Sequence, residues 1–294
     1  EQTIVDVERR WKAMGEPRLI LACPTCELAL QQGLPQAQTV SLWQVLDEME
    51  PPARPALGHG EPLALHDSCT ARTNRAAQDA ARSLVLKCGY QLEELPYSRE
   101  RTKCCGYGGL MYAVAPGVAD KAVASRVGES PLDYATYCSN CRDLFARQGK
   151  TAYHLLELLF EAHESGAPPR PGPTFSQRRA NRRMLAETVL ATHWGEHMPP
   201  PPAHTELRLH LIDGLAAKME REFITEDDVK DVIDHAERTG EKLMCPPANR
   251  FVAHHRPSLV TYWVEYAQAR NVYEVFNVYS HRMQIADEGD RSGS

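Results

Sequence analysis

The chain has 294 residues, with 33 Lys and Arg against 39 Asp and Glu, so its formal net charge is −6. This acidic balance argues against a nucleic-acid binder, because such proteins usually carry a basic surplus. No run approaches the ~20 apolar residues of a membrane-spanning helix, and no signal peptide opens the chain. We therefore expect no membrane span, no nucleic-acid partner and a cytoplasmic location.

The first half of the chain alternates between short apolar strands and helical stretches. We expect strands at 18–22, 63–65 and 134–137, and helices at 4–14, 41–49, 71–88, 117–128 and 151–163. Such alternation predicts an α/β fold with a mostly parallel sheet. Its sites should lie just past the strand ends, where Cys23, Cys69 and Cys138 fall.

The second half changes in pattern. A Pro-rich linker at 165–173 precedes an Arg-rich helix at 176–194 and four prolines at 199–202. Leucines and a methionine at 207, 211, 215 and 219 recur four residues apart, which predicts a further helix. Thr225 is the expected N-cap of the next helix, which ends at Gly240. Three β-rich segments at 251–253, 260–266 and 272–279 then predict a small α+β module with an antiparallel meander.

Two segments of the chain resemble each other and are 115 residues apart. Each has a strand, a Cys-x-x-Cys pair, a helix, a glycine and a closing helix; the pairs are Cys23 with Cys26 and Cys138 with Cys141. An ancestral duplication explains this agreement. Only 22 residues precede Cys23, so any further cysteines of the first copy would lie upstream. We infer either that the chain is the C-terminal part of a longer protein or that the first copy has lost its site.

The second copy concentrates cysteine. Cys69 is followed after 34 residues by the adjacent pair Cys104 and Cys105, and after 32 more by Cys138 and Cys141. Five thiols exceed what tetrahedral zinc requires, and thiolates are the usual ligands of iron–sulfur clusters. Glycines at 106, 108 and 109 would let backbone N–H groups approach cluster sulfides, while Arg101 and Lys103 add positive charge.

This pattern, Cys-x34-Cys-Cys-Gly-x31-Cys-x2-Cys, resembles the cysteine-rich CCG domain over about residues 18–165. That domain occurs in heterodisulfide reductases and in iron–sulfur subunits of glycolate and lactate oxidases. The resemblance implies an α/β domain in which five cysteines hold a [4Fe–4S] cluster, of the non-cubane kind in the reductase. Carried over by position, the ligands are Cys69, Cys104, Cys105, Cys138 and Cys141.

The expected organisation is a remnant of a first CCG repeat at 1–62 and a complete CCG domain at 63–165. A Pro/Arg-rich linker and helix at 166–204 and an α+β tail module at 205–294 follow. Cys23 and Cys26 form a second, partial site, and His66 is a candidate for cluster contact or proton transfer. His254, His255 and His281 are a less favoured metal site, because adjacent residues of a strand point to opposite faces.

Two functions remain open. The first is an iron–sulfur electron-transfer subunit of an oxidoreductase, which takes electrons from a flavoprotein or ferredoxin-type donor and reduces a disulfide. The second is a zinc- or cluster-stabilised docking module of a larger redox complex, without chemistry of its own. A thiol–disulfide exchanger based on Cys23 and Cys26 is a third, weaker option.

Overall fold

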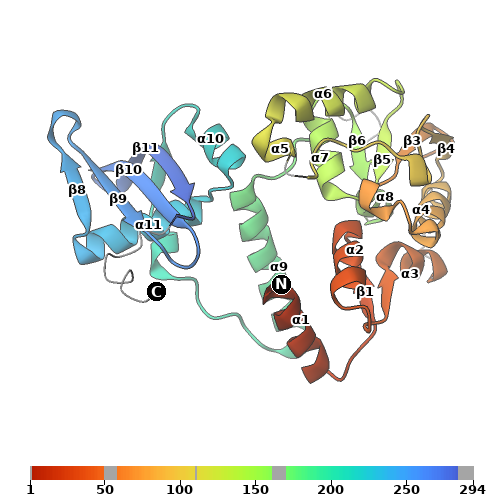
Figure 1. The fold of residues 1–294 in the computed structure, drawn as a ribbon, viewed down its shortest axis with the longest axis horizontal. Coiled ribbons are helices and arrows are strands. Elements are labelled where there is room, and N and C mark those ends of the chain that lie inside the picture. Colours follow the sequence, from red (N-terminus) through yellow and green to blue (C-terminus); the bar gives the residue numbers. More distant parts are fainter. Residues whose placement is uncertain (1, 50–57, 110, 161–169, 284–294) are drawn as a thin grey trace, which may run out of the picture. The chain divides into compact units, whose positions relative to one another are not determined.

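The computed structural model describes residues 2–49, 58–109, 111–160 and 170–283. The chain divides into two compact units, Glu1–Gly172 and Pro173–Ser294 (Figure 1). Most of the loop expected at 51–62 and of the linker expected at 165–173 lies outside the described residues. The division at 62, 165 and 204 stays a prediction.

The N-terminal unit is built around a parallel sheet of four strands in the order β4-β3-β5-β6. The strands are β3 (Pro62–His66), β4 (Gln91–Glu94), β5 (Tyr134–Thr136) and β6 (Ala152–His154). The helices between and after them are α4 (Arg75–Lys87), α5 (Met111–Val114), α6 (Pro116–Val127), α7 (Ser139–Arg147) and α8 (Leu155–Phe160). The predicted α/β class with a mostly parallel sheet is confirmed.

The central strands of this sheet are buried on both faces, as parallel strands covered by helices require. Leu63 and Leu65 pack with α4 on one face, whereas Ala64 and Tyr134 pack with Phe145 on the other. Packing on both faces of the sheet holds the carboxyl ends of the paired strands β3 and β5 next to each other.

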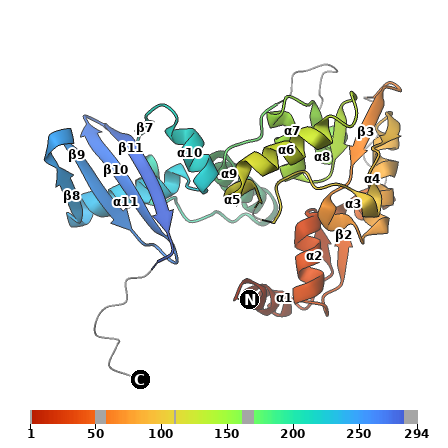
Figure 2. The same ribbon diagram turned by 45° about the horizontal axis from the view of Figure 1, so that its top comes forward.

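A smaller sheet precedes this core. It pairs β1 (Leu19–Leu21) with β2 (Thr39–Ser41) in parallel, and is accompanied by α1 (Gln2–Ala13), α2 (Pro24–Gly33) and α3 (Leu42–Glu48). α3 packs along α4 of the larger sheet (Figure 2).

The two similar segments have the same element order, β1-α2-β2-α3 and β5-α7-β6-α8. In both, the first helix begins directly after an extended cysteine, Cys23 (φ −101°, ψ 117°) or Cys138 (φ −132°, ψ 116°). One expectation was wrong here: 151–163 is not helical throughout, because Ala152–His154 pairs with β5 before α8 begins.

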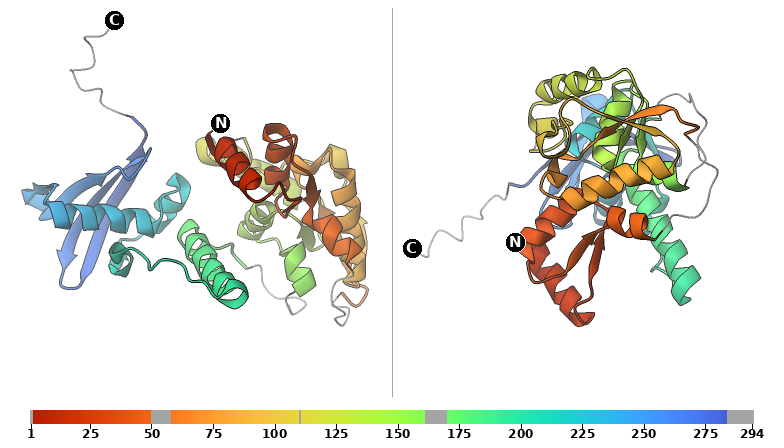
Figure 3. Two further views of the ribbon diagram at one scale, coloured as in Figure 1. Left: turned by 90° about the horizontal axis from the view of Figure 1, so that it is seen from below. Right: turned by 90° about the vertical axis from the view of Figure 1, so that its right-hand side faces the viewer.

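The C-terminal unit contains a five-stranded sheet in the order β7-β11-β10-β9-β8. Its strands are β7 (Leu209–Leu211), β8 (Lys242–Cys245), β9 (Arg250–His255), β10 (Thr261–Ala269) and β11 (Val272–His281). β9, β10 and β11 form the predicted antiparallel meander. β8, which the sequence did not predict, pairs with β9, and β7 joins β11 in parallel. The helices are α9 (Phe175–Trp194), α10 (Leu215–Glu222) and α11 (Glu226–Thr239), and α11 crosses one face of the sheet (Figure 3, left).

The helix predicted from the four-residue spacing over 207–219 is wrong in its first half. Leu209 and Leu211 lie in β7 and pair with Tyr273 and Val275 of β11. Gly214, with φ +79°, then starts α10 at Leu215. The helical period holds only for Leu215 and Met219, because Leu211 pairs with β11 and Leu207 ends the 3₁₀ turn Ala203–Glu206; both are partly buried against the core of this unit.

The predicted N-cap of α11 is confirmed. The Thr225 hydroxyl accepts from the backbone N–H of Asp228, and the Asp228 carboxylate accepts from the backbone N–H of Thr225. Gly240 ends the helix in the left-handed conformation. The start and end of α11 were therefore predicted more accurately from the sequence than the short strands were.

Four short 3₁₀ turns complete the described elements: Cys69–Ala71, Arg99–Arg101, Ala203–Glu206 and Pro246–Ala248. Within the described ranges, no helix combines the length and apolar character needed to cross a membrane.

Candidate metal centre

Three turns that carry cysteines meet at the carboxyl end of the larger sheet. Cys69 opens the 3₁₀ turn shortly after β3, and Cys138 caps α7 just beyond β5. Cys104 and Cys105 follow the turn Arg99–Arg101. Because the carboxyl ends of parallel strands share one edge, these turns are brought together as the sequence predicted.

All five predicted ligands lie close enough together to affect one another's pKa, and we call them the five-thiol row. Cys104 interacts with both Cys69 and Cys105. Cys105 also interacts with Cys141, which in turn interacts with Cys138. The row therefore extends from the turn after β3 to the start of α7.

The row favours thiolates at two positions. Hydrogen bonds from Cys105 and Cys69 hold the pKa of Cys104 well below that of an ordinary thiol. A hydrogen bond from Cys141 lowers the pKa of Cys138 to about 6. The donating thiols are stabilised as neutral groups: the hydrogen bond to Cys104 raises the pKa of Cys105 to about 12, and those of Cys69 and Cys141 are raised as well.

The glycine turn presents backbone N–H groups to this row. The Gly106 N–H donates to the Cys104 sulfur at 3.4 Å, and the Gly108 N–H also donates to it. Gly106 has φ +92°, and a Cβ there would lie 2.8 Å from the Ala119 carbonyl oxygen. Glycine at 106 is therefore required by both the backbone conformation and the space, whereas Gly108 has no atom within 4 Å of such a Cβ.

The ligand atoms of this site indicate which metal or cluster it could bind. A site of sulfur ligands only suits iron–sulfur clusters and zinc, and backbone N–H groups directed at sulfur are typical of cluster sites. The chemistry of the residues therefore fits such a group. Within the described ranges, however, no three His, Cys, Asp or Glu side chains are arranged around a single point where they could hold one metal ion.

Cys23 and Cys26, the predicted partial site, lie on the turn that starts α2. Burial, followed by the interaction with the Cys23 thiol, raises the pKa of Cys26. The turn packs against the turn of Cys69: the Thr25 and Thr70 hydroxyls are 3.2 Å apart. The structure thus places the Cys23 turn next to the five-thiol row, which the sequence did not predict.

His66, the predicted candidate for cluster contact or proton transfer, is fully buried at the end of β3. Its Nδ1 accepts from Arg126 Nε at 3.0 Å, and in the described part of the chain its Nε2 has no partner. Burial, aided by the Arg126 charge, lowers the pKa of His66 to about 3. His66 is therefore a neutral imidazole within electrostatic reach of Cys104.

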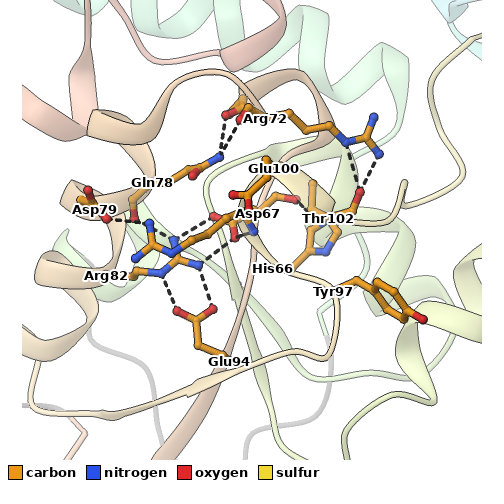
Figure 4. A network of polar contacts seen from close by, with 12 residues as sticks. His66, Asp67, Arg72, Gln78, Asp79, Arg82, Glu94, Tyr97, Glu100 and Thr102 are labelled. Atoms are coloured by element: carbon orange, nitrogen blue, oxygen red, sulfur yellow. Dashed lines mark hydrogen bonds and ion pairs between the residues drawn. The ribbon is translucent and has the colours of Figure 1, made fainter.

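A buried ion-pair network beside His66 was missed at the sequence level (Figure 4). Arg82 donates two hydrogen bonds to Asp67, at 3.0 and 2.8 Å, and two to Glu94, at 2.6 and 2.8 Å. Tyr137 Oη and the Arg99 N–H also donate to the Asp67 carboxylate. These contacts hold its pKa below the usual range against burial. An acid directly after a buried strand was the available signal, but its arginine partner lies 15 residues away.

Arg101 and Lys103, the two cations predicted to lie beside the thiols, interact with other residues. Lys103 Nζ lies 4.4 Å from the centre of the Tyr97 ring and also pairs with Glu129. The Arg101 guanidinium lies 5.4 Å from the same ring. Arg72 instead interacts electrostatically with Cys69, while its guanidinium donates to the Thr102 carbonyl.

The remaining cysteines and the predicted histidines occur elsewhere in the chain. Cys88 is buried near the Leu158 carbonyl, and Cys245 is exposed. His254 stacks on Trp263, whereas its neighbour His255 stacks on His235 of α11. The adjacent histidines thus point to opposite faces of the sheet.

A parallel α/β domain whose carboxyl edge carries a thiol-only site defines a metal- or cluster-binding module of redox type. Residues 63–142 match the family model of the cysteine-rich domain CCG, so the chain contains a CCG domain, as the cysteine spacing predicted. Comparison with curated proteins and with solved structures gave no match.

Proposed function

We propose that Cys69, Cys104, Cys105, Cys138 and Cys141 hold an iron–sulfur cluster, of the non-cubane [4Fe–4S] kind. The chain would then be an electron-transfer subunit of an oxidoreductase that reduces a disulfide. The observation that carries this proposal is that five cysteines inside the CCG domain lie on turns at one edge of the parallel sheet and interact with one another. Five sulfurs are more than four-coordinate zinc takes up, and a cluster accepts thiolate ligands at several irons.

The residues of the chain support this function in two further ways. Thiolates are favoured at Cys104 and Cys138, so two ligands are prepared for binding before the cluster arrives. The N–H groups of Gly106 and Gly108 stabilise negative charge on sulfur, which favours the reduced form of a bound cluster. When bound, the cluster supplies single electrons, which a flavoprotein or ferredoxin-type partner would provide.

The first experiment measures iron, zinc and acid-labile sulfide per chain in protein purified without oxygen, with EPR spectra before and after oxidation. We expect about four iron and four sulfide per chain. Both should be lost together in Cys104→Ser/Cys105→Ser. Cys245→Ser is the matched control, because Cys245 is exposed and far along the chain in the other unit.

The opposite result is equally informative. About one zinc per chain without sulfide would overturn the electron-transfer proposal. It would favour the second function, a zinc-stabilised docking module of a larger redox complex. Equal losses of iron in Cys245→Ser and in the double variant would show that the iron is not held by the five-thiol row.

A further inference from the structure

Cys23 and Cys26 lie at the junction between a strand and a helix. β1 ends at Leu21, α2 starts at Pro24, and β2 then returns parallel to β1, so the pair follows the first strand of a β-α-β unit. Functional groups in such units gather at the carboxyl ends of the strands. A Cys-x-x-Cys pair in this position is typical of redox-active dithiols. β2, which completes the unit, was not predicted from the sequence.

The start of α2 places the two cysteine side chains next to each other. Cys23 is the N-cap, with an extended backbone, and Cys26 is the third residue of the helix. In α11 the same two positions are occupied by Thr225 and Asp228, whose side chains meet in a hydrogen bond of 2.6 Å. The thiols of Cys23 and Cys26 likewise interact. The pair is therefore arranged for the reversible formation of a disulfide.

Both thiols of this pair are exposed to solvent, unlike the corresponding pair of the second repeat. There, Cys141 is buried and interacts with Cys105 of the five-thiol row as well as with Cys138. In the described part of the chain, the interactions that link the row involve neither Cys23 nor Cys26. The first pair is thus accessible to a disulfide in solution, whereas the second belongs to the candidate metal centre.

Packing fixes the turn that carries the exposed pair. Pro24 and Glu27 are buried in the first turn of α2, and a proline at the first helical position sets its backbone angle in advance. Asn74 Nδ2 donates to Glu27 Oε1 at 2.8 Å, and the hydroxyls of Thr70 and Thr25 are 3.2 Å apart. Both contacts join α2 to the segment after β3. The turn is therefore held in place while its two sulfurs stay open to solvent.

We propose that Cys23 and Cys26 form a second redox site, a dithiol that exchanges with external disulfides independently of the five-thiol row. The Cys23 sulfur attacks one sulfur of a disulfide R–S–S–R′, the S–S bond breaks, and R′S⁻ leaves. Cys26 then attacks the Cys23 sulfur of this mixed disulfide, and RS⁻ leaves. The external disulfide takes up two electrons from the pair, and the two thiol protons end on RSH and R′SH.

The first test measures the redox state of the pair in the full chain, purified without oxygen. The protein is equilibrated with mixtures of reduced and oxidised glutathione, and its remaining thiols are blocked with iodoacetamide. Between Glu8 and Glu27, Cys23 and Cys26 are the only cysteines, so cleavage after glutamate isolates the pair for mass spectrometry. We expect a single two-electron transition from two blocked thiols to one internal disulfide.

The second test follows the same peptide after hydroxyethyl disulfide is added to the reduced protein. In Cys26→Ser the reaction should stop at a mixed disulfide of Cys23 with one mercaptoethanol. In Cys23→Ser the rate at which the peptide reacts should fall about tenfold or more. Cys245→Ser is the matched control, because Cys245 is an exposed thiol in the other unit, and the pair should react in it as in the wild type.

Several results would overturn this second site. The proposal is wrong if no internal disulfide forms at any ratio of the two glutathiones, or if Cys26→Ser and the wild type give the same products. It is also wrong if Cys23→Ser/Cys26→Ser loses iron and sulfide, since the pair would then bind the cluster. The exchange needs no cluster, so zinc in place of iron and sulfide would overturn only the electron-transfer proposal.

Discussion

Asp67 is a fully buried carboxylate at the end of β3, two residues before Cys69. Burying a charge is unfavourable unless it is paired and hydrogen-bonded. Asp67 meets this requirement with Arg82, Tyr137 and the Arg99 N–H, and its carbonyl accepts from the Thr102 hydroxyl at 2.8 Å. The network thus joins the turn after β3 to the segment that leads to Cys104 and to Tyr137, which directly precedes Cys138.

Gly106 allows a direct test of the glycine turn. In Gly106→Ala, the new Cβ would meet the Ala119 carbonyl oxygen at 2.8 Å, with φ held at +92°. We expect the free energy of unfolding of the metal-free protein to fall by about 2 kcal/mol, as strained backbone positions typically do. Denaturant unfolding at constant pH measures this change.

Gly108→Ala is the matched control, because nothing lies within 4 Å of its Cβ and its φ is outside the left-handed region. Its unfolding free energy should stay within about 0.5 kcal/mol of the wild type. Gly109→Ala separates the two effects, since Gly109 has φ +65° but open space. Equal stability of Gly106→Ala and Gly108→Ala would contradict the structure of this turn.

At the scale of elements, α11 shows how closely local sequence can specify a helix. Thr225 and Asp228 form a capping box, and the carboxylates of the first turn, Glu226, Asp227 and Asp228, lie at the positive end of the helix. Thr225→Ala should lower the unfolding free energy by about 1 kcal/mol, because it leaves the Asp228 N–H without its acceptor.

The control for this variant is Thr188→Ala in the same unit. Thr188 lies on the exposed surface of α9, where its hydroxyl donates to the Met184 carbonyl, and alanine is the better helix former. Its stability should change by less than about 0.5 kcal/mol. Thermal or denaturant unfolding followed by far-UV circular dichroism compares the two, and an equal loss in both would count against the cap.

The elements predicted correctly from the sequence are those whose conformation is determined by residues close to them in the chain. The strands that precede Cys69 and Cys138 are runs of apolar residues, and α11 carries its own start and stop signals. β7 and β6 were missed because their strand conformation comes from distant partners: Leu209 pairs with Tyr273, and Ala152 with Tyr134. A four-residue spacing of leucines cannot reveal that β11 competes for them.

The candidate site, too, was predicted only in part from the sequence. The spacing of the five cysteines identified the residues that the structure brings into one row. The contact between Thr25 and Thr70 could not be predicted, because these residues are 45 positions apart and meet only through the packing of α2 on the turn after β3. The pairing of Asp67 with Arg82 likewise depends on α4 returning along the sheet.

At the scale of the whole molecule, the C-terminal unit has what an independent domain requires. Its core consists of residues from Leu207 onward, among them Val229, Ile233, Val264 and Val278, and all five strands of its sheet belong to it. We therefore expect a fragment 173–294 to fold alone and to unfold cooperatively in denaturant, with a far-UV spectrum that contains both helix and strand. The same fragment with Val264→Ala should be about 2 kcal/mol less stable, as large-to-small changes at buried sites are.

Without a cooperative transition, or with amide NMR resonances that are not dispersed, the fragment would depend on the remainder of the chain, and the boundary at 172 would not separate folding units. If fragment 173–294 folds, the remaining fragment 1–172 retains every residue of the five-thiol row, so its iron and sulfide content should equal that of the full chain.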